Sequence, residues 1–419
     1  MSSYLKALRQ FNRDVWLNLV AWALLAFAYF GVQAVIFNLY LLRLGYGPEF
    51  IGLLIGVGQL AGALCALPAG LVSTRLGARR AIILGLTIVA GAWVLMLLVE
   101  TLPTTLHMGG FIATQIISWV GGVLFAVSAT PFMMSSAAPE ERNHAFAMQG
   151  AVTGLFGVLG SLVGGSLPGW VAALFDATLE QPGPYRTALW IVPLAYLLAV
   201  LALLPTRRAE TITAATVVTQ PAAPIPLRLL IFFGLLVWLQ TLGEGVVRAF
   251  FNVYLDTGLH VPTARIGLIF GIAQVLPIAA ALFTPVILAW LGKASTLGWT
   301  TLVAGLGLLP IALGAGVAVA SVSYFTVLAM LAILNTARTV FSQEAVTEQG
   351  RATMSAVVTL GVTLGWSVAA ISGGWVITAL GFPALFLGGA ITALLAVVLL
   401  IGYLYWVPLK QTIPTPTIV

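Results

Sequence analysis

Long uncharged apolar runs recur along the sequence, and they restrict the possible folds more than any other feature. Two of them, 51–72 and 81–99, contain no Asp, Glu, Lys or Arg. A helix needs about 20 apolar residues to cross the hydrocarbon core of a membrane. Here 60% of the residues are hydrophobic and 7% are charged, whereas soluble proteins carry about 25% charged residues. The chain is therefore predicted to be a polytopic membrane protein.

The same runs also decide between the two structures that cross lipid. Backbone groups in hydrocarbon must satisfy their own hydrogen bonds, which leaves helices or a closed barrel. The runs lack the alternation of polar and apolar residues that is typical of barrel strands. We predict an all-α polytopic membrane protein with twelve transmembrane helices, at 15–42, 49–73, 80–101, 109–135, 144–168, 187–205, 228–255, 265–291, 297–318, 321–343, 351–378 and 384–406.

The positions of Lys and Arg predict how these helices are oriented. Cytoplasmic loops of membrane proteins are enriched in both residues. With the N-terminus inside, the cytoplasmic side carries thirteen of them and the outer side three, namely Arg43, Arg186 and Arg265. We expect an integral protein of a bacterial-type inner membrane, with cytoplasmic N- and C-termini. The placement of Lys and Arg in cytoplasmic loops also accounts for the net charge of +6, so no nucleic-acid partner is expected.

The two halves of the sequence repeat each other. Residues 31–41 and 245–255 share six of eleven residues, and 51–60 and 266–275 share five of ten. An offset of half the chain predicts two pseudo-symmetric six-helix bundles in the same orientation. The expected boundaries are 1–205 for the N-terminal bundle, 206–227 for a cytoplasmic linker, 228–406 for the C-terminal bundle and 407–419 for a cytoplasmic tail.

A short cationic connection joins the second and third predicted helices. Its spacing resembles the signature loop of the major facilitator superfamily (MFS), with matches at Gly70, Arg75, Gly77, Arg79 and Arg80 and with Thr74 at the family's acidic position. Together with the two halves, this resemblance implies the MFS fold, alternating access and a midplane site lined by helices 1, 4, 7 and 10. Thr74 cannot make a charge-assisted hydrogen bond. In the family, this acidic residue helps to hold the two halves together on the cytoplasmic side in the outward-open state. We therefore expect this contact, the cytoplasmic latch, to be weaker here than is usual in the family.

Glu244 is the acidic residue that lies well inside a predicted helix, and Arg248 follows one turn later. A charged side chain at the bilayer centre costs about 2.5–3.5 kcal/mol even on lenient scales, so such residues usually serve a function. Glu244 is a candidate proton carrier, with Arg248 as its partner. The alternatives are a role in substrate binding or gating, and a fixed ion pair that positions helix 7.

Neutral polar residues and one further arginine are candidates for contact with a substrate. Spacings of three or four residues place side chains on one face of a helix, which groups Tyr29 with Gln33, Gln115 with Trp119 and Asn335 with Arg338. Ordinary helix packing is the alternative for each pair. The substrate-cavity candidates are Tyr29, Gln33, Gln115, Trp119, Gln240, Asn335 and Arg338. Arg338 needs an acidic partner, backbone carbonyls or an anionic substrate, and Glu244 is the expected protein partner.

The sequence lacks the motifs of catalysis. No catalytic constellation, metal-ligand cluster or phosphate-binding loop with a following Lys-Ser/Thr is found, so we expect no enzyme activity, no metal, no cofactor and no ATP-driven transport. Helix 5 resembles the glycine-rich motif of drug/proton antiporters, but Gly160-Ser161 stands at its Gly-Pro position and Gly373-Gly374 lies at the equivalent place on helix 11. We therefore interpret these glycines as helix packing, with the resemblance as secondary support for export. We predict a monomeric secondary transporter in membrane lipid that exports a small amphipathic solute against H⁺. Uptake of a polar solute such as a sugar is the alternative, and a non-transporting sensor or enzyme is the alternative of another class.

Overall fold

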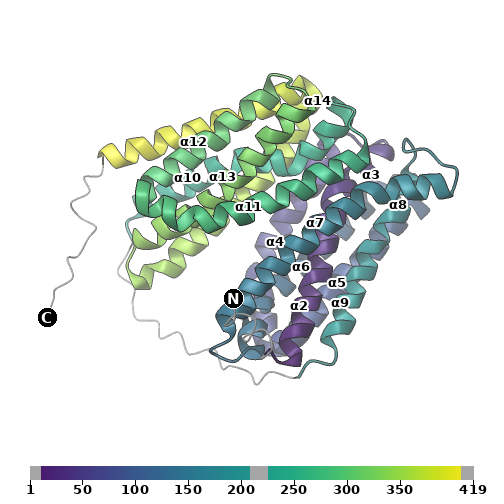
Figure 1. Cartoon of the computed structure of the whole chain (residues 1–419), viewed down its shortest axis with the longest axis horizontal. Helices are drawn as coiled ribbons and strands as arrows, with labels where there is room; N and C mark the ends of the chain where they lie inside the picture. Colours follow the sequence, from purple (N-terminus) through teal and green to yellow (C-terminus); the bar gives the residue numbers. More distant parts are fainter. Residues whose placement is uncertain (1–10, 208–224, 407–419) are drawn as a thin grey trace. The chain divides into compact units, whose positions relative to one another are not determined.

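A computed structural model describes residues 11–207 and 225–406 of the chain. The expected tail at 407–419 and most of the expected linker, 208–224, lie outside the described residues. Within these ranges the structure is built from helices (Figure 1). They are α2 (Arg13–Ala26), η1 (Phe27–Gln33), α3 (Ala34–Arg43), α4 (Pro48–Leu76), α5 (Ala78–Leu98), η2 (Val99–Thr101), α6 (Thr104–Ser136), α7 (Arg142–Leu174), α8 (Pro182–Leu189), α9 (Ile191–Leu203), α10 (Leu227–Val253), η3 (Tyr254–Gly258), α11 (Thr263–Leu291), α12 (Lys293–Ala312), α13 (Val317–Glu344), η4 (Glu348–Gly350) and α14 (Arg351–Trp406).

The number of membrane crossings agrees with the sequence prediction. Eleven helical stretches in the described ranges are long and apolar enough to cross a membrane, and the last of them, Glu348–Tyr405, is 58 residues long. About 20 residues suffice for one crossing. Gly381 interrupts α14 with φ 83° and ψ 174°, two residues before Pro383, so this stretch contains two spans. The predicted all-α fold with twelve spans is confirmed.

Several helix ends differ from the predicted ones. The fifth predicted helix was expected to stop at 168, and an outer loop was expected over 169–186. Instead α7 continues through Pro168 to Leu174, and α8 begins at Pro182. Proline is tolerated within membrane helices because neighbouring groups satisfy the freed carbonyl. The fourth predicted helix likewise begins earlier, at Thr104.

The described residues form two compact units, each of which we describe by itself. Unit 1 takes those within 1–218, together with 249–275 and 370–378, and unit 2 takes those within 219–248, 276–369 and 379–419. The helices α10, α11 and α14 therefore contribute residues to both units. The boundaries expected from the sequence repeat stay a prediction.

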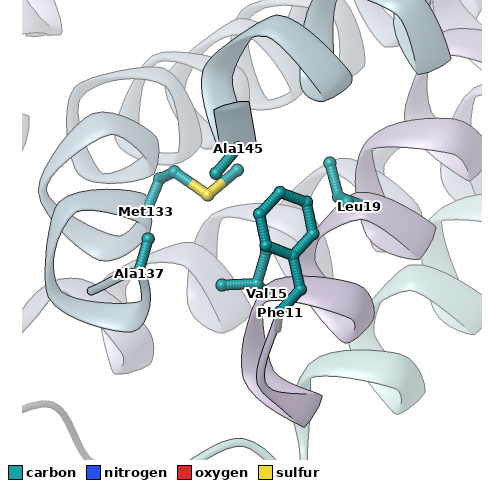
Figure 2. Packing of buried hydrophobic residues seen from close by; sticks show 6 residues of the cluster. All are labelled: Phe11, Val15, Leu19, Met133, Ala137 and Ala145. Atoms are coloured by element: carbon teal, nitrogen blue, oxygen red, sulfur yellow. The ribbon is translucent and has the colours of Figure 1, made fainter. Parts of the chain in front are cut away.

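Close helix packing holds unit 1 together. Helix α2 contacts α7 and α9, while α6 contacts α4 and α5. Figure 2 shows the apolar cluster at the start of α2, in which Phe11, Val15 and Leu19 meet Met133 and Ala145. Burying a side chain of this size contributes about 1.5–3 kcal/mol. The cluster fixes the start of α2 against α6 and α7.

Two close approaches in unit 1 require glycine. A Cβ on Gly165 of α7 would lie 2.6 Å from the Cα of Gly267 on α11, and a Cβ on Gly164 would lie 2.8 Å from the Cα of Val32. Real Cβ contacts are not this short. The glycines of α7 therefore let its backbone approach η1 and α11, as small residues do in other membrane helices.

Helix 1 changes its geometry where it meets α7. Seven residues, Phe27–Gln33, form the π-helical segment η1 between α2 and α3. A π-helical segment turns the following side chains relative to an uninterrupted α-helix, and such segments are frequent at functional sites. The sequence pattern of helix 1 does not distinguish this segment from an ordinary α-helix. Tyr29 and Gln33, two of the predicted cavity residues, lie within it.

Unit 2 is organised around the first part of α10. A Cβ on Gly243 would lie 2.9 Å from the carbonyl oxygen of Gly389, and a Cβ on Gly245 would lie 3.2 Å from the Cα of Trp366. Both parts of α14 therefore pack closely on α10. Helix α12 packs on α13 and reaches α14 through Gly305, whose added Cβ would lie 2.7 Å from that of Ala393. These contacts surround Glu244.

Candidate functional site

Unit 1 contains a cavity of about 260 Å³ beside the π-helical segment. The four residues predicted in its helices as substrate contacts, Tyr29, Gln33, Gln115 and Trp119, all line it. Most of the other lining side chains are aromatic or aliphatic; among them are Trp22, Leu25, Phe30, Leu86, Phe125 and Tyr196. The structure thus brings together two predicted pairs that are more than 80 residues apart in the sequence.

Glycines on α4 position the indole of Trp119. A Cβ on Gly62 would lie 3.0 Å from Trp119 Cε3, and a Cβ on Gly58 would collide with the Trp119 ring and lie 3.2 Å from Gln115 Cγ. Only small residues at these positions leave room for the ring beside α4. The Trp22 and Phe125 rings meet edge to face, with centroids 5.1 Å apart, a favourable arrangement for aromatic pairs.

Three polar groups of this cavity have no hydrogen-bond partner within the described ranges. Buried Trp22 Nε1 and Gln33 Oε1 both lack one. The amide of Gln115, a residue that is 5% exposed, likewise makes no hydrogen bond to the residues that the structure describes. Buried polar groups are normally paired. Their convergence on one cavity is what a binding site for a small polar group requires.

Unit 2 contains the predicted charged pair. Arg248 Nε donates a hydrogen bond to Glu244 Oε1 at 2.7 Å, as their spacing of four residues allows. The Glu244 side chain is 1% exposed, whereas that of Arg248 is 48% exposed and lies over the Trp366 ring at 5.6 Å. Glu244 Oε2 is buried and has no hydrogen-bond partner among the described residues. One carboxylate oxygen is therefore paired and the other is available.

A second cavity, of about 10 Å³, lies next to this carboxylate. Gln240 and Glu244 both line it, and each has a buried oxygen that no group in the described part of the chain bonds to. The Gln240 Nε2 donates to Thr301 Oγ1 at 3.0 Å, so only its carbonyl remains. A cavity of this size is about the smallest that holds one water. Two acceptors facing such a space suit a molecule that donates protons.

Arg338 does not form an ion pair with Glu244. Its NH2 group donates to Asn335 Oδ1 at 2.5 Å, and its buried NH1 group has no hydrogen-bond partner in the part of the chain that the structure describes. The residue is 6% exposed and interacts with Glu244 only through longer-range electrostatics. The expected acidic partner is paired with Arg248 instead, so Arg338 is a buried cation without a carboxylate partner.

The predicted signature loop contacts the end of the sixth span. Arg79 Nε donates to Thr206 Oγ1 at 2.9 Å, and its NH2 group donates to the carbonyl of Leu204. Arg79 therefore caps the carbonyl of Leu204 at the C-terminal end of α9, where a cation also interacts favourably with the helix dipole. Gly77 has φ 82°, which favours glycine. The Thr74 hydroxyl donates to the carbonyl of Leu71, on its own helix, at 2.9 Å. The side chains of Arg75 and Arg80 make no hydrogen bond within the described ranges, and Gly70 has no side chain to make one.

Sequence reasoning missed an ion-paired cluster at the end of α3 in unit 1. Arg43 donates to both carboxylate oxygens of Asp256, at 2.7 and 2.8 Å, and to the carbonyl of Leu179 at 2.9 Å. Its guanidinium lies 5.5 Å from the centre of the Tyr185 ring. Arg43 and Asp256 each follow one copy of the repeated 31–41 and 245–255 segments, and this placement of opposite charges was the available signal.

Neighbouring contacts extend this cluster. Asn38 Nδ2 donates to Asn252 Oδ1 at 3.1 Å, so these two residues of the repeated segments join α3 to α10. On the loop after α3, burial and the nearby Glu100 carboxylate raise the pKa of Tyr46.

Among the residues that the structure describes, no group of three or more His, Cys, Asp or Glu is arranged to hold a metal ion.

Comparison with known proteins gives a consistent result. Residues 19–353 match the family described as Major Facilitator Superfamily. A mutant of the nucleoside transporter NupG is similar in structure, with a TM-score of 0.73, 17% identity and coverage of 94% of this chain and 99% of that one. The xylose transporter XylE from E. coli gives a TM-score of 0.69, with 13% identity and 96% and 95% coverage.

A bacterial homologue of the iron transporter ferroportin is also similar, with a TM-score of 0.69, 16% identity and coverage of 93% of this chain and 98% of that one. No curated protein sequence matches the chain. At these identities the structural likeness shows the fold alone.

Proposed function

The chain belongs to the Major Facilitator Superfamily and is an integral membrane protein with a transporter fold, and on that premise we propose that it is a proton-coupled secondary transporter that exports a small amphipathic organic solute by alternating access. Its proposed location is a bacterial-type inner membrane, with both termini cytoplasmic. There it works as a monomer in contact with lipid, and it has no enzymatic activity.

The buried carboxylate of Glu244 is the observation that carries the proposal. One of its oxygens is paired with Arg248 and the other borders a water-sized cavity without a partner. An ionised carboxylate in a low-dielectric site is stable only while a cation or hydrogen bonds compensate its charge. Arg248 is half-exposed, so its side chain has room to turn away. Glu244 then takes up a proton, so that the protonation state of Glu244 is coupled to the conformation of α10.

The cavity of unit 1 supports the substrate class. Its walls are mainly aromatic and aliphatic, and its polar groups are few. A solute with an apolar body and a small polar part suits such a surface, because every polar group left unpaired on binding would cost about 1–3 kcal/mol. Export as the direction rests on the glycine-rich α7, where Gly160-Ser161 occupies the position of the antiporter motif.

Uptake of a polar solute is the second candidate. Unpaired Trp22 Nε1 and Gln33 Oε1 in the cavity favour it, because both would bind groups of a polar ligand. Two of the structurally similar proteins are a nucleoside transporter and a xylose transporter. Measuring transport with the proton gradient imposed in each direction separates export from uptake.

Glu244→Gln tests the proton coupling. A radiolabelled ligand, chosen from a chemically broad panel by thermal stabilisation of the purified protein, is followed in proteoliposomes. The variant is expected to lose transport driven by a pH gradient and to keep counterflow exchange, because the amide cannot release a proton. Glu344→Gln is the matched control, since Glu344 is an exposed partner of Lys293. Gradient-driven transport at the wild-type rate in Glu244→Gln would exclude Glu244 as the carrier.

A further inference from the structure

The cavity of unit 1 is layered along its two main helices. Helix α2 runs antiparallel to α6, because Asn12 bonds to Ser136 at one end while the Trp22 ring meets that of Phe125 further along. Contacts between these two positions, such as that of Asn18 with Met133, follow the same order. The Trp22–Phe125 pair therefore fixes a common level on both helices.

Measured from this level, the two amides of the cavity lie at similar heights. Gln33 is eleven residues beyond Trp22, and Gln115 is ten residues before Phe125. At the α-helical rise of 1.5 Å per residue, Gln115 lies roughly 15 Å along α6 from the ring pair. Seven of the eleven residues that lead to Gln33 belong to the π-helical segment η1, which rises less per residue, so Gln33 lies nearer the ring pair than the roughly 16 Å of a regular α-helix. Tyr29 and Trp119 are each one turn closer to it. The cavity thus has a layer of two amides above a layer of two aromatic rings.

The amides are available to a ligand. Gln33 makes no hydrogen bond to the described part of the protein, and its Oε1 is buried. Gln115 is 5% exposed and makes none either. Each amide has one acceptor and two donors, so the layer accepts and donates at the same height. The walls carry no Asp, Glu, Lys or Arg.

We infer, building on the proposed transport function, that this cavity binds an uncharged, flat heteroaromatic solute whose hydrogen-bonding edge lies against Gln33 and Gln115 and whose rings lie against Tyr29 and Trp119. A neighbouring N–H and C=O on one ring edge, as in a lactam, match the acceptor and donor of the amides. The flat ring matches the aromatic layer, where stacking is favourable.

Two other ligand classes fit the same cavity less well. A sugar has hydroxyls on all sides, and the aliphatic and aromatic walls would leave most of them without a partner, which opposes binding. An organic cation would interact with the rings but would lose its hydration in a cavity without a carboxylate. The binding experiment distinguishes these classes directly.

The test uses four probes and the purified full-length protein at fixed pH, with binding measured by calorimetry. The probes are 2-quinolinone, which has the N–H and C=O edge, 1-methyl-2-quinolinone, which lacks the N–H, the N-methylquinolinium cation, and D-glucose. We expect 2-quinolinone to bind at least tenfold more tightly than the cation and glucose. Methylation of its nitrogen should weaken binding about fivefold to tenfold, the usual effect of losing one hydrogen bond.

Protein variants locate the contact. Gln33→Leu and Gln115→Leu should each weaken binding of 2-quinolinone by about the effect of one lost hydrogen bond. The variant that removes the acceptor of the N–H should leave binding of the methylated form little changed, whereas the variant that removes the donor to the C=O should weaken binding of both forms. Gln343→Leu is the matched control, because Gln343 bonds to Ser355 and does not line the cavity. Wild-type affinity for 2-quinolinone in both cavity variants would overturn the inference, as would absent binding or a preference for glucose or the cation.

The comparison between the two quinolinones is made on the wild-type protein and does not depend on how well a variant folds. These measurements also separate the ligand class from the transport proposal, because they use no gradient. Selective lactam binding with normal transport by Glu244→Gln would contradict only the proton coupling. Proton-coupled transport of a sugar or cation would contradict only the ligand class.

Discussion

Asp256→Asn would leave the guanidinium of Arg43 buried without its carboxylate. Arg43 donates to both oxygens of Asp256, and the two side chains are 15% and 7% exposed. Removing one partner of a buried ion pair costs about 3–5 kcal/mol. We expect the lower end, about 3 kcal/mol, because Arg43 keeps its hydrogen bond to the carbonyl of Leu179 and its contact with the Tyr185 ring.

Thermal unfolding of the purified protein, followed by intrinsic fluorescence, measures this effect. At about 2–4 °C per kcal/mol for a domain of 150–250 residues, a loss of about 3 kcal/mol lowers Tm by about 6–12 °C. The double variant Arg43→Met/Asp256→Leu should recover at least half of that loss, since replacing both buried charges by apolar groups is often neutral.

An exposed ion pair is the control for this prediction. Lys293 and Glu344 are 44% and 53% exposed, and pairs of this kind contribute about 0–1 kcal/mol. Glu344→Gln should therefore change Tm much less than Asp256→Asn does. Equal shifts in the two variants, or a double variant less stable than Asp256→Asn, would refute the reasoning that burial makes the Arg43–Asp256 pair important.

Two further predictions concern Arg338 and Thr74. Arg338→Met should reduce transport at least tenfold without lowering Tm. The reason is that the buried NH1 group of Arg338 has no partner in the described ranges, and residues of this kind reduce stability in exchange for function. A lower Tm with unchanged transport would assign Arg338 to structure. Thr74→Asp should shift the protein towards the outward-open state, because an acidic residue restores the family's cytoplasmic latch; unchanged labelling of cysteines introduced on the cytoplasmic side would contradict this.

The fold and part of the site could be predicted because they depend on local patterns. Apolar runs of sufficient length located the spans, and a spacing of four residues placed Glu244 next to Arg248. Spacing also paired Gln33 with Tyr29 and Gln115 with Trp119. Combining the two pairs in one region required the family resemblance, because nothing in the sequence itself joins helix 1 to helix 4.

Features that depend on tertiary packing could not be predicted. The π-helical segment at Phe27–Gln33 has the same apolar composition as its neighbours, and it forms where Gly31 meets Gly160 of α7. The Arg43–Asp256 pair joins residues 213 positions apart. The partner of Arg338 was predicted wrongly, because Arg248 lies on the same helix as Glu244 and pairs with it at close range.

Proton movement during transport tests the central claim most directly. Wild-type proteoliposomes containing a pH-sensitive dye, with the membrane potential clamped at zero, receive an outward or inward gradient of the selected ligand. Proton-coupled transport predicts a change of internal pH that depends on the ligand gradient, reverses sign with it, and is absent in Glu244→Gln but present in Glu344→Gln. Ligand movement at the same rate without any change of internal pH would contradict the account.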